Sequence, residues 1–146
     1  MRTRQGADAL WRRAGSSVWI LSIVLTSGLA PHAGAQAPVP ALQKYPDVVA
    51  VQVRAAGLGR FDFDVTVSSP YDTPARYADA FRVSARDGTV FGERRLLHDH
   101  AGEQPFTRDL HGVSIPAGVQ SVVVQARDSR FGYGGKSAVV MLPGMR

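Results

Sequence analysis

The sequence predicts an all-β protein, folded as an antiparallel β-sandwich of about seven short strands. Between residues 48 and 146, runs of alternating apolar and polar residues are separated by glycine, proline and aspartate. Such alternation is typical of half-buried strands, and the separating residues favour turns. This range lacks the apolar spacing of three and four residues that an amphipathic helix requires. Short strands with turns between them favour two packed sheets.

Residues 1–35 predict a secretory signal peptide. Four arginines and one aspartate lie within 1–17, an uncharged and mostly apolar run follows over 18–30, and Ala33-Gly34-Ala35 has the small residues of a cleavage site. A helix over 18–30 would reach about 20 Å, short of the roughly 30 Å hydrocarbon core of a membrane. We therefore expect cleavage near Ala35, and a periplasmic or secreted protein that meets the membrane only during export. An uncleaved membrane anchor is the alternative.

Residues 36–47 are rich in proline, which removes amide donors and disfavours helix. We expect a linker or an extended edge segment here, before a sandwich domain over 48–146; a disordered N-terminus of the mature chain is the alternative. The first two strands are predicted over 48–55 and 60–68. In the first, the side chains expected on one face are Val49, Val51 and Val53. In the second, the inward side chains are Phe61, Phe63, Val65 and Val67.

Thr73 followed by Pro74 is typical of a helix N-cap and first helical position, so we expect one helical turn over 74–77. Phe81 and Val83 then alternate with polar residues. Asp87-Gly88 indicates a tight type I′ hairpin leading to a return strand over 89–97.

Three further strands complete the predicted domain. They lie over 106–115, with a break at Gly112, over 119–128 and over 136–142. The glycine-rich residues 132–135 are expected to form the last hairpin loop.

The last hairpin has a recognisable pattern. It consists of Val122-x-Val124-x-Ala126, a polar turn, Gly132-x-Gly134 and Lys136-Ser137-Ala138-Val139-Val140. This pattern resembles the final two strands of a fibronectin type III domain, which implies an immunoglobulin-like β-sandwich. A wider pattern over 69–74, 76–80 and 98–108 resembles small exported bacterial proteins of unknown function. That resemblance implies no activity.

The charge of the chain is mostly a property of the signal peptide. The whole sequence has 17 Lys and Arg against 12 Asp and Glu, and loss of four arginines and one aspartate leaves 13 against 11. The remaining arginines are interleaved with acids, whereas a nucleic-acid-binding surface needs a clustered basic face. The sequence contains no cysteine, which excludes disulfides, a thiol nucleophile and a cysteine-linked lipid anchor.

The densest group of metal-ligating residue types lies in the segment 98–106. On an extended chain His98 and His100 point to one side, as two ligands of a zinc or copper site would. His111 on the next strand is the expected third ligand, with Asp99 or Glu103 as a fourth ligand or a hydrogen-bond partner of one. Imidazoles without thiolates favour Zn(II) or Cu(II). The alternative is a structural loop whose histidines bind backbone carbonyls.

The loops 69–77 and 129–133 are the second candidate site. Their candidate partner-binding residues are Tyr71, Asp72, Tyr77, Phe131 and Tyr133. Aromatic residues on the loops of a sandwich suit binding of a protein, peptide or glycan. Alternatively, these rings pack back on the core, and the polar groups form a structural network in which Asp72 or Asp99 pairs with Arg76 or Arg108.

From these features we expect an exported, non-catalytic binding or structural module. The alternative is a periplasmic metal-binding protein that uses His98, His100 and His111. A hydrolase is a third hypothesis, because serine, histidine and aspartate are all present, but the G-x-S-x-G motif is absent. The glycines at 132–135 do not precede a helix, so they do not indicate a phosphate-binding loop.

Overall fold

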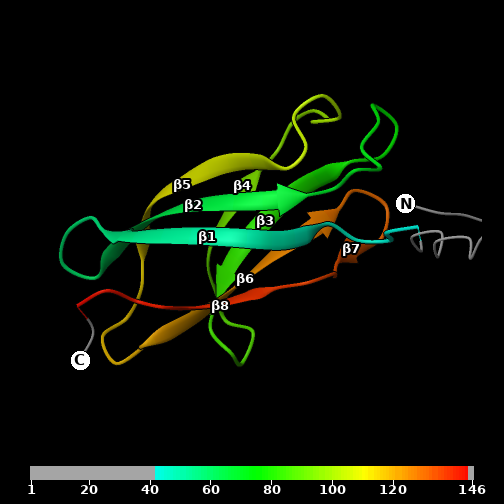
Figure 1. Ribbon diagram of the computed structural model, residues 1–146. Helices are drawn as coiled ribbons and strands as arrows, with labels where there is room; N and C mark the ends of the chain where they lie inside the picture. The colour runs from blue at the N-terminus through cyan, green and yellow to red at the C-terminus, as the bar shows by residue number, and fades with distance from the viewer. Residues whose placement is uncertain (1–41, 145–146) are drawn as a thin grey trace, which may run out of the picture. The chain divides into compact units, whose positions relative to one another are not determined.

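Alternating apolar and polar residues form eight strands that pack as two antiparallel sheets (Figure 1). The computed structural model describes residues 42–144. Its strands are β1 (Asp47–Ala55), β2 (Arg60–Ser68), β3 (Ala78–Ser84), β4 (Val90–Arg95), β5 (Phe106–Ser114), β6 (Ser121–Asp128), β7 (Gly132–Tyr133) and β8 (Ala138–Met141). The predicted all-β antiparallel sandwich is confirmed. The predicted signal peptide and residues 36–41 of the proline-rich segment lie outside the described residues.

The strand order brings together segments that are far apart in the sequence. One sheet has the order β1-β2-β5, and the other has the order β4-β3-β6. Both β7 and β8 pair with β6: β8 lies along Ser121 to Val124, and β7 along Arg127 and Asp128. The chain therefore leaves the five-stranded sheet after β4 and joins the three-stranded sheet as β5. Within residues 42–144 there is no helix with the length and apolar character needed to cross a membrane.

The core lies between the two sheets. The side chains predicted to point inward from β2 are all buried: Phe61, Phe63, Val65 and Val67. They belong to one cluster with Phe81 and Val83 of β3 and with Val122 and Val124 of β6. Burial of such side chains is the main favourable term in folding.

The predicted face of β1 is wrong for Val49. A register shift between Val48 and Ala50 rotates the start of the strand, so Val48 is buried at 1% exposure while Val49 is 48% exposed. Val51 and Val53 pack against the core as predicted. A bulge of this kind adds a residue to one strand and reverses the side-chain alternation on either side of it.

Two predicted turns differ from the structure. Thr73 and Arg76 exchange backbone hydrogen bonds of 2.8 and 3.0 Å, so Pro74 lies in a tight two-residue turn rather than in a helical turn. The hairpin at Asp87-Gly88 forms, but its loop is longer than a type I′ turn. The amide of Ala85 binds the carbonyl of Thr89, which leaves three residues between them, and Gly88 has a φ of +93°.

The predicted break of β5 at Gly112 is confirmed by its φ of +64° and a register shift.

The last hairpin also differs from the prediction. Its turn lies between β6 and β7, and Gly134-Gly135 separates β7 from β8. At these two glycines the segment 45–47 passes so close that a Cβ atom would overlap the Tyr45 ring or the Pro46 carbonyl. The amide of Val48 then binds the carbonyl of Lys136 at 2.8 Å. The described end of the proline-rich segment therefore packs against the sandwich.

Candidate functional site

A pocket of about 310 Å³ opens where β4 ends and β5 begins. Its lining residues are Arg94, Arg95, Leu96, Leu97, His98, His100 and Arg108. We call this group the basic pocket. Because β4 and β5 belong to different sheets, their adjacent edges bring Arg94 and Arg108 together across the side of the sandwich.

The arginines of the basic pocket are only partly neutralised. Arg108 donates to Glu103 at 2.8 Å, and Arg94 lies 4.0 Å from Asp109. Arg95 forms no salt bridge with the residues described. The lining itself contains no acidic side chain, so the pocket carries an excess of positive charge.

His100 forms one wall of the pocket and is only 3% exposed. Its ring stacks on Phe106 at a centroid distance of 4.0 Å and lies 4.7 Å from the ring of His98. Burial, together with the charges of Arg108 and His98, lowers the pKa of His100 below its usual value. The imidazole is therefore neutral at pH 7.

Two buried nitrogen atoms of the basic pocket have no hydrogen-bond partner within residues 42–144. They are Nδ1 of His100 and Nε of Arg94. A buried polar atom left unpaired costs about 1–3 kcal/mol. Such atoms in a native fold call for a missing partner, such as a water molecule or an ion.

Asp72 and Gln104 hold the histidine segment in place. Asp72 is only 4% exposed, and its two oxygens accept the amides of Ala78 and His100, each at 3.0 Å. The side chain of Gln104 accepts from the amide of Ser69 at 2.7 Å and donates to the carbonyl of His100 at 3.1 Å. Asp72, predicted to contact a partner, instead organises the interior.

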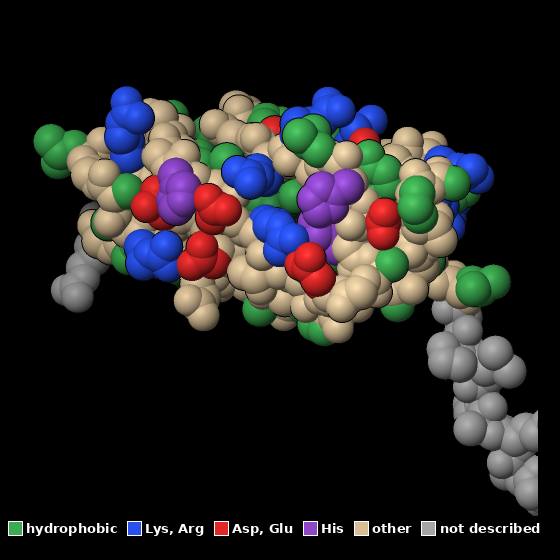
Figure 2. Space-filling view, turned by 90° about the horizontal axis from the view of Figure 1, so that it is seen from above, with side chains coloured by type: hydrophobic (Ala, Val, Ile, Leu, Met, Phe, Trp, Pro, Cys, Tyr) green, Lys and Arg blue, Asp and Glu red, His purple; other side chains and the backbone are tan. Residues whose placement is uncertain are grey.

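The structure does not bring the three predicted histidine ligands together. His111 lies on β5, where it contacts Asp109 at 2.7 Å and Asp62 at 3.4 Å. His100 packs against Phe106, and His111 lies five residues further along the same strand. Five residues of strand span roughly 17 Å, so His111 is far from His100. Figure 2 shows histidine side chains at two separate places on this face.

The remaining predicted metal ligands have other contacts. Asp99 accepts from the amide of Ala101 at 3.3 Å, and Glu103 is paired with Arg108. Across residues 42–144, no group of three or more His, Cys, Asp or Glu side chains is placed to hold a metal ion. The predicted set of His98, His100 and His111, with Asp99 or Glu103, is therefore not assembled.

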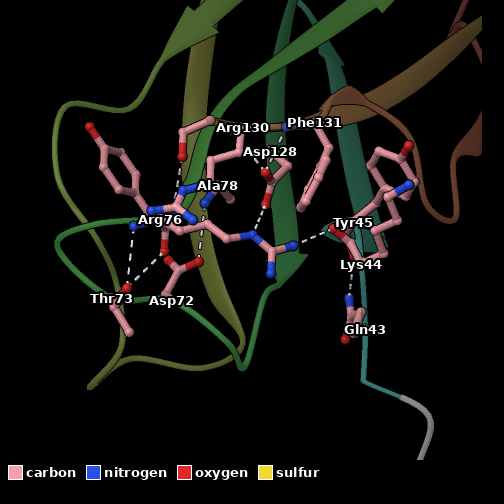
Figure 3. A network of polar contacts seen from close by, with 12 residues as sticks. Gln43, Lys44, Tyr45, Asp72, Thr73, Arg76, Ala78, Asp128, Arg130 and Phe131 are labelled. Carbon is pink, nitrogen blue, oxygen red and sulfur yellow. Dashed lines mark hydrogen bonds and ion pairs between the residues drawn. The ribbon is translucent and has the colours of Figure 1, made fainter.

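A second cluster surrounds Arg76 at the other loops (Figure 3). The guanidinium lies over the rings of Tyr71 and Phe131, at 4.1 and 4.8 Å from their centroids, and donates to Asp128 at 3.0 Å. It also donates to the carbonyl of Lys44. This arginine therefore ties the 69–77 loop to the β6–β7 turn and to the N-terminal segment.

Asp128 is fully buried at the centre of this cluster. Burial alone would raise its pKa, but hydrogen bonds from the amides of Arg130 and Phe131 and from the side chain of Arg76 outweigh it, so the pKa is lowered. Burial, with the nearby charge of Asp128, raises the pKa of Tyr71. The carboxylate therefore stays ionised and the phenol stays neutral.

The predicted partner-binding aromatics have different environments. Phe131 is 50% exposed, whereas the hydroxyl of Tyr71 is buried. The backbone of Tyr77 is paired with Ser129, and Tyr133 donates to Glu93 at 2.6 Å with Arg82 stacked on its ring. Tyr71, Tyr77 and Tyr133 are each partly buried, so Phe131 is the most exposed of these rings.

The arginine pairs expected from the sequence also differ. Arg76 pairs with Asp128 and Arg108 with Glu103, rather than with Asp72 or Asp99. Sequence reasoning predicted a return strand over 89–97 and did not include its Arg94 and Arg95 in a site. The only feature of the sequence that could have drawn attention to these two arginines is their position beside Leu96 and His98. That position does not reveal that Arg108 lies opposite.

Comparison with known proteins yields no relative: no protein-family model, no curated protein and no solved structure matches this chain. Its function therefore has to be argued from the arrangement of its own residues. Both clusters contain a buried polar atom without a partner, and the cavity described above lies at the basic pocket. In the Arg76 cluster, the buried Asp128 is fully engaged by the surrounding chain.

Proposed function

We propose that this chain is an exported, non-catalytic β-sandwich module that binds a ligand or partner group in the basic pocket. The observation that carries the proposal is a cavity of about 310 Å³ lined by three arginines and two histidines. Ligand sites are concave, have volumes from about 300 Å³ upward and present a few convergent polar groups among apolar ones. Leu96 and Leu97 supply the apolar part of this lining.

The chemistry of the lining supports binding over catalysis. Its residues are arginine, leucine and histidine, without a serine, threonine or carboxylate that a histidine could activate as a nucleophile. The acids next to the lining are already engaged: Glu103 by Arg108 at 2.8 Å, and Asp72 by the amide of His100 at 3.0 Å. The pocket therefore offers charge and shape, but no paired groups for acid–base work.

Export and an immunoglobulin-like topology are part of the same proposal. Export is supported by the charge and hydropathy pattern of residues 1–35. The topology is supported by the strand order, because the first, second and fifth strands share one sheet while the third, sixth and last strands share the other. The suggested kinship with small exported bacterial proteins of unknown function stays a prediction.

Export is tested by expressing the full chain in a Gram-negative host and sequencing the N-terminus of the periplasmic product. We expect the product to begin at Gln36. A full-length chain retained in the membrane fraction would instead support the uncleaved anchor.

Binding is tested by recording amide NMR spectra of the purified protein with acetate, phosphate, maltose, a lysine-rich peptide and Zn(II) or Cu(II), each added separately. We expect at least one of these to shift signals of residues 94–100 and 108 in a saturable way. If no compound moves these signals, the basic pocket is not a binding site. One equivalent of bound metal, lost in both His98→Ala and His111→Ala, would favour the metal-binding alternative.

A further inference from the structure

The charge of the basic pocket defines the kind of group that it can hold. Arg94, Arg95 and Arg108 line the cavity, and the carboxylates near them are Glu103, Asp109 and Asp79. The Arg94–Asp109 pair is long at 4.0 Å, and Arg95 forms no salt bridge within residues 42–144, although its charge acts on Asp79. The excess positive charge would repel a cationic ligand, whereas an anion would neutralise it.

The guanidinium groups of the lining point to a ligand with oxygen acceptors. Nε of Arg94 is a donor that cannot lose its proton, and it is buried without an acceptor. His100 is almost completely buried, and one of its ring nitrogens also lacks a partner. Guanidinium groups present parallel N–H donors that match the oxygens of carboxylate, phosphate and sulfate.

The surroundings of the pocket favour a small group over an extended polyanion. Outside it, arginines such as Arg54, Arg76 and Arg127 are each paired with an aspartate. Figure 2 shows blue and red side chains interleaved across the visible face, without a continuous basic track. A long acidic polymer would need such a track to bind along its length.

We propose that the basic pocket is a receptor for a single oxyanionic group, a carboxylate or a phosphate or sulfate group, gripped by Arg94 and Arg108 beside His100, with the charge of Arg95 close by. This inference rests on the proposed function and names its ligand class. The exposed Leu97 of the lining can contact the apolar or neutral remainder of a molecule that carries the oxyanion.

The experiment is a titration of the purified protein with sodium phosphate, sulfate and acetate at constant ionic strength, followed by amide and arginine side-chain NMR. The chloride concentration is adjusted to keep ionic strength fixed, since screening alone shifts many exposed signals. We expect saturable shifts for residues 94–100 and 108 with at least one oxyanion. The order of the three affinities shows whether phosphate, sulfate or a carboxylate fits the pocket best.

Variants separate a built site from general charge attraction. Arg95→Gln removes a guanidinium that makes no salt bridge, so the fold is expected to survive, and it should weaken binding by about tenfold. Arg94→Lys keeps the charge but loses the planar fork, and should also weaken binding. The matched control is Arg54→Gln, which removes the same charge from the exposed Arg54–Asp64 pair on β1 and should leave binding unchanged.

Each other outcome overturns the inference. Absence of saturable shifts with any oxyanion excludes the site, as does equal weakening by Arg54→Gln and Arg95→Gln. Binding of heparin or poly-glutamate without binding of the small anions would indicate an extended acidic partner instead. Saturable binding of maltose or a cationic peptide in the same pocket would refute the oxyanion while leaving the proposed binding function intact.

Discussion

Asp72 accepts a hydrogen bond from the backbone amide of His100 at 3.0 Å, although 28 residues separate them in the sequence. The other carboxylate oxygen of Asp72 accepts the amide of Ala78 at the start of β3. One buried side chain therefore joins the loop before β3 to the segment that forms a wall of the basic pocket.

Replacement of Asp72 by Ala leaves both amides buried without an acceptor. We expect a loss of about 3 kcal/mol in the free energy of unfolding, and faster hydrogen exchange at His100 and Ala78. Denaturant unfolding and amide exchange measure the two effects. Asp99→Ala is the matched control, because Asp99 makes a single hydrogen bond of 3.3 Å to a neighbouring exposed amide. Equal losses in the two variants would contradict the organising role of Asp72.

The Arg76–Asp128 pair is expected to dominate the stability of the opposite loops. Arg76→Met removes the cation from a fully buried carboxylate, and breaking a buried pair costs about 3–5 kcal/mol. The folded-state pKa of Asp128 is lowered, so its contribution is present above the unfolded pKa and is lost as pH falls through the folded value.

Chemical denaturation of wild type and Arg76→Met between pH 3 and 7 tests this pair. The wild type should lose stability toward the acidic end, and the difference between the two proteins should shrink there. Arg54→Met, at an exposed pair, should cost less than about 1 kcal/mol. A difference that does not change with pH would argue against ionised Asp128 as the cause.

His100 makes the fold sensitive to mild acid. Its folded-state pKa is below the usual value, so the unfolded chain binds more protons as pH drops below about 6.5, and stability falls in that range. The charged groups that act on this ring are Arg108, His98, Glu103 and Asp72. His100→Phe keeps the stack on Phe106 and should flatten the melting temperature between pH 5 and 7, measured by thermal denaturation. An unchanged pH profile would assign the effect to another group.

Gly135 allows the N-terminal segment to approach β8. Its φ is +75°, and a Cβ atom there would overlap the carbonyl of Pro46. We expect Gly135→Ala to lower stability by about 2 kcal/mol or more, through left-handed strain and a displaced segment. Gly102→Ala, at an open position without a positive φ, should be close to neutral in the same unfolding assay. A neutral Gly135→Ala would show that the segment can move away without cost.

The alternation of apolar and polar residues was sufficient to predict the inward side chains where one face of a strand is buried. The apolar side chains of β2 alternate over the whole strand, and all four point inward as predicted. The break at Gly112 was also readable, because a glycine interrupts an otherwise regular strand. Val49 was misplaced because a bulge depends on the pairing partner β2, which alternation within β1 does not describe.

The candidate sites show the same limit. The density of acidic residues and imidazoles around residue 100 marked a segment that lines the basic pocket, but the expected grouping with His111 depended on which strand positions lie opposite. The structure pairs His111 with Asp62 and Asp109, and it brings Arg108 to the pocket instead. Side-chain partners across two sheets depend on registers that no single segment contains.

The sequence alone determined that this chain forms an antiparallel sandwich, since a period of two in apolar residues can be buried only by strands. It also determined the inward set of β2 and the positions of most turns. Only the tertiary structure decided that β4 and β5 meet at the side of the sandwich and enclose three arginines around a buried histidine. The physical reason is that the alternation of apolar residues specifies which face of each strand is buried. Which charged side chains meet depends instead on how the chain crosses from one sheet to the other.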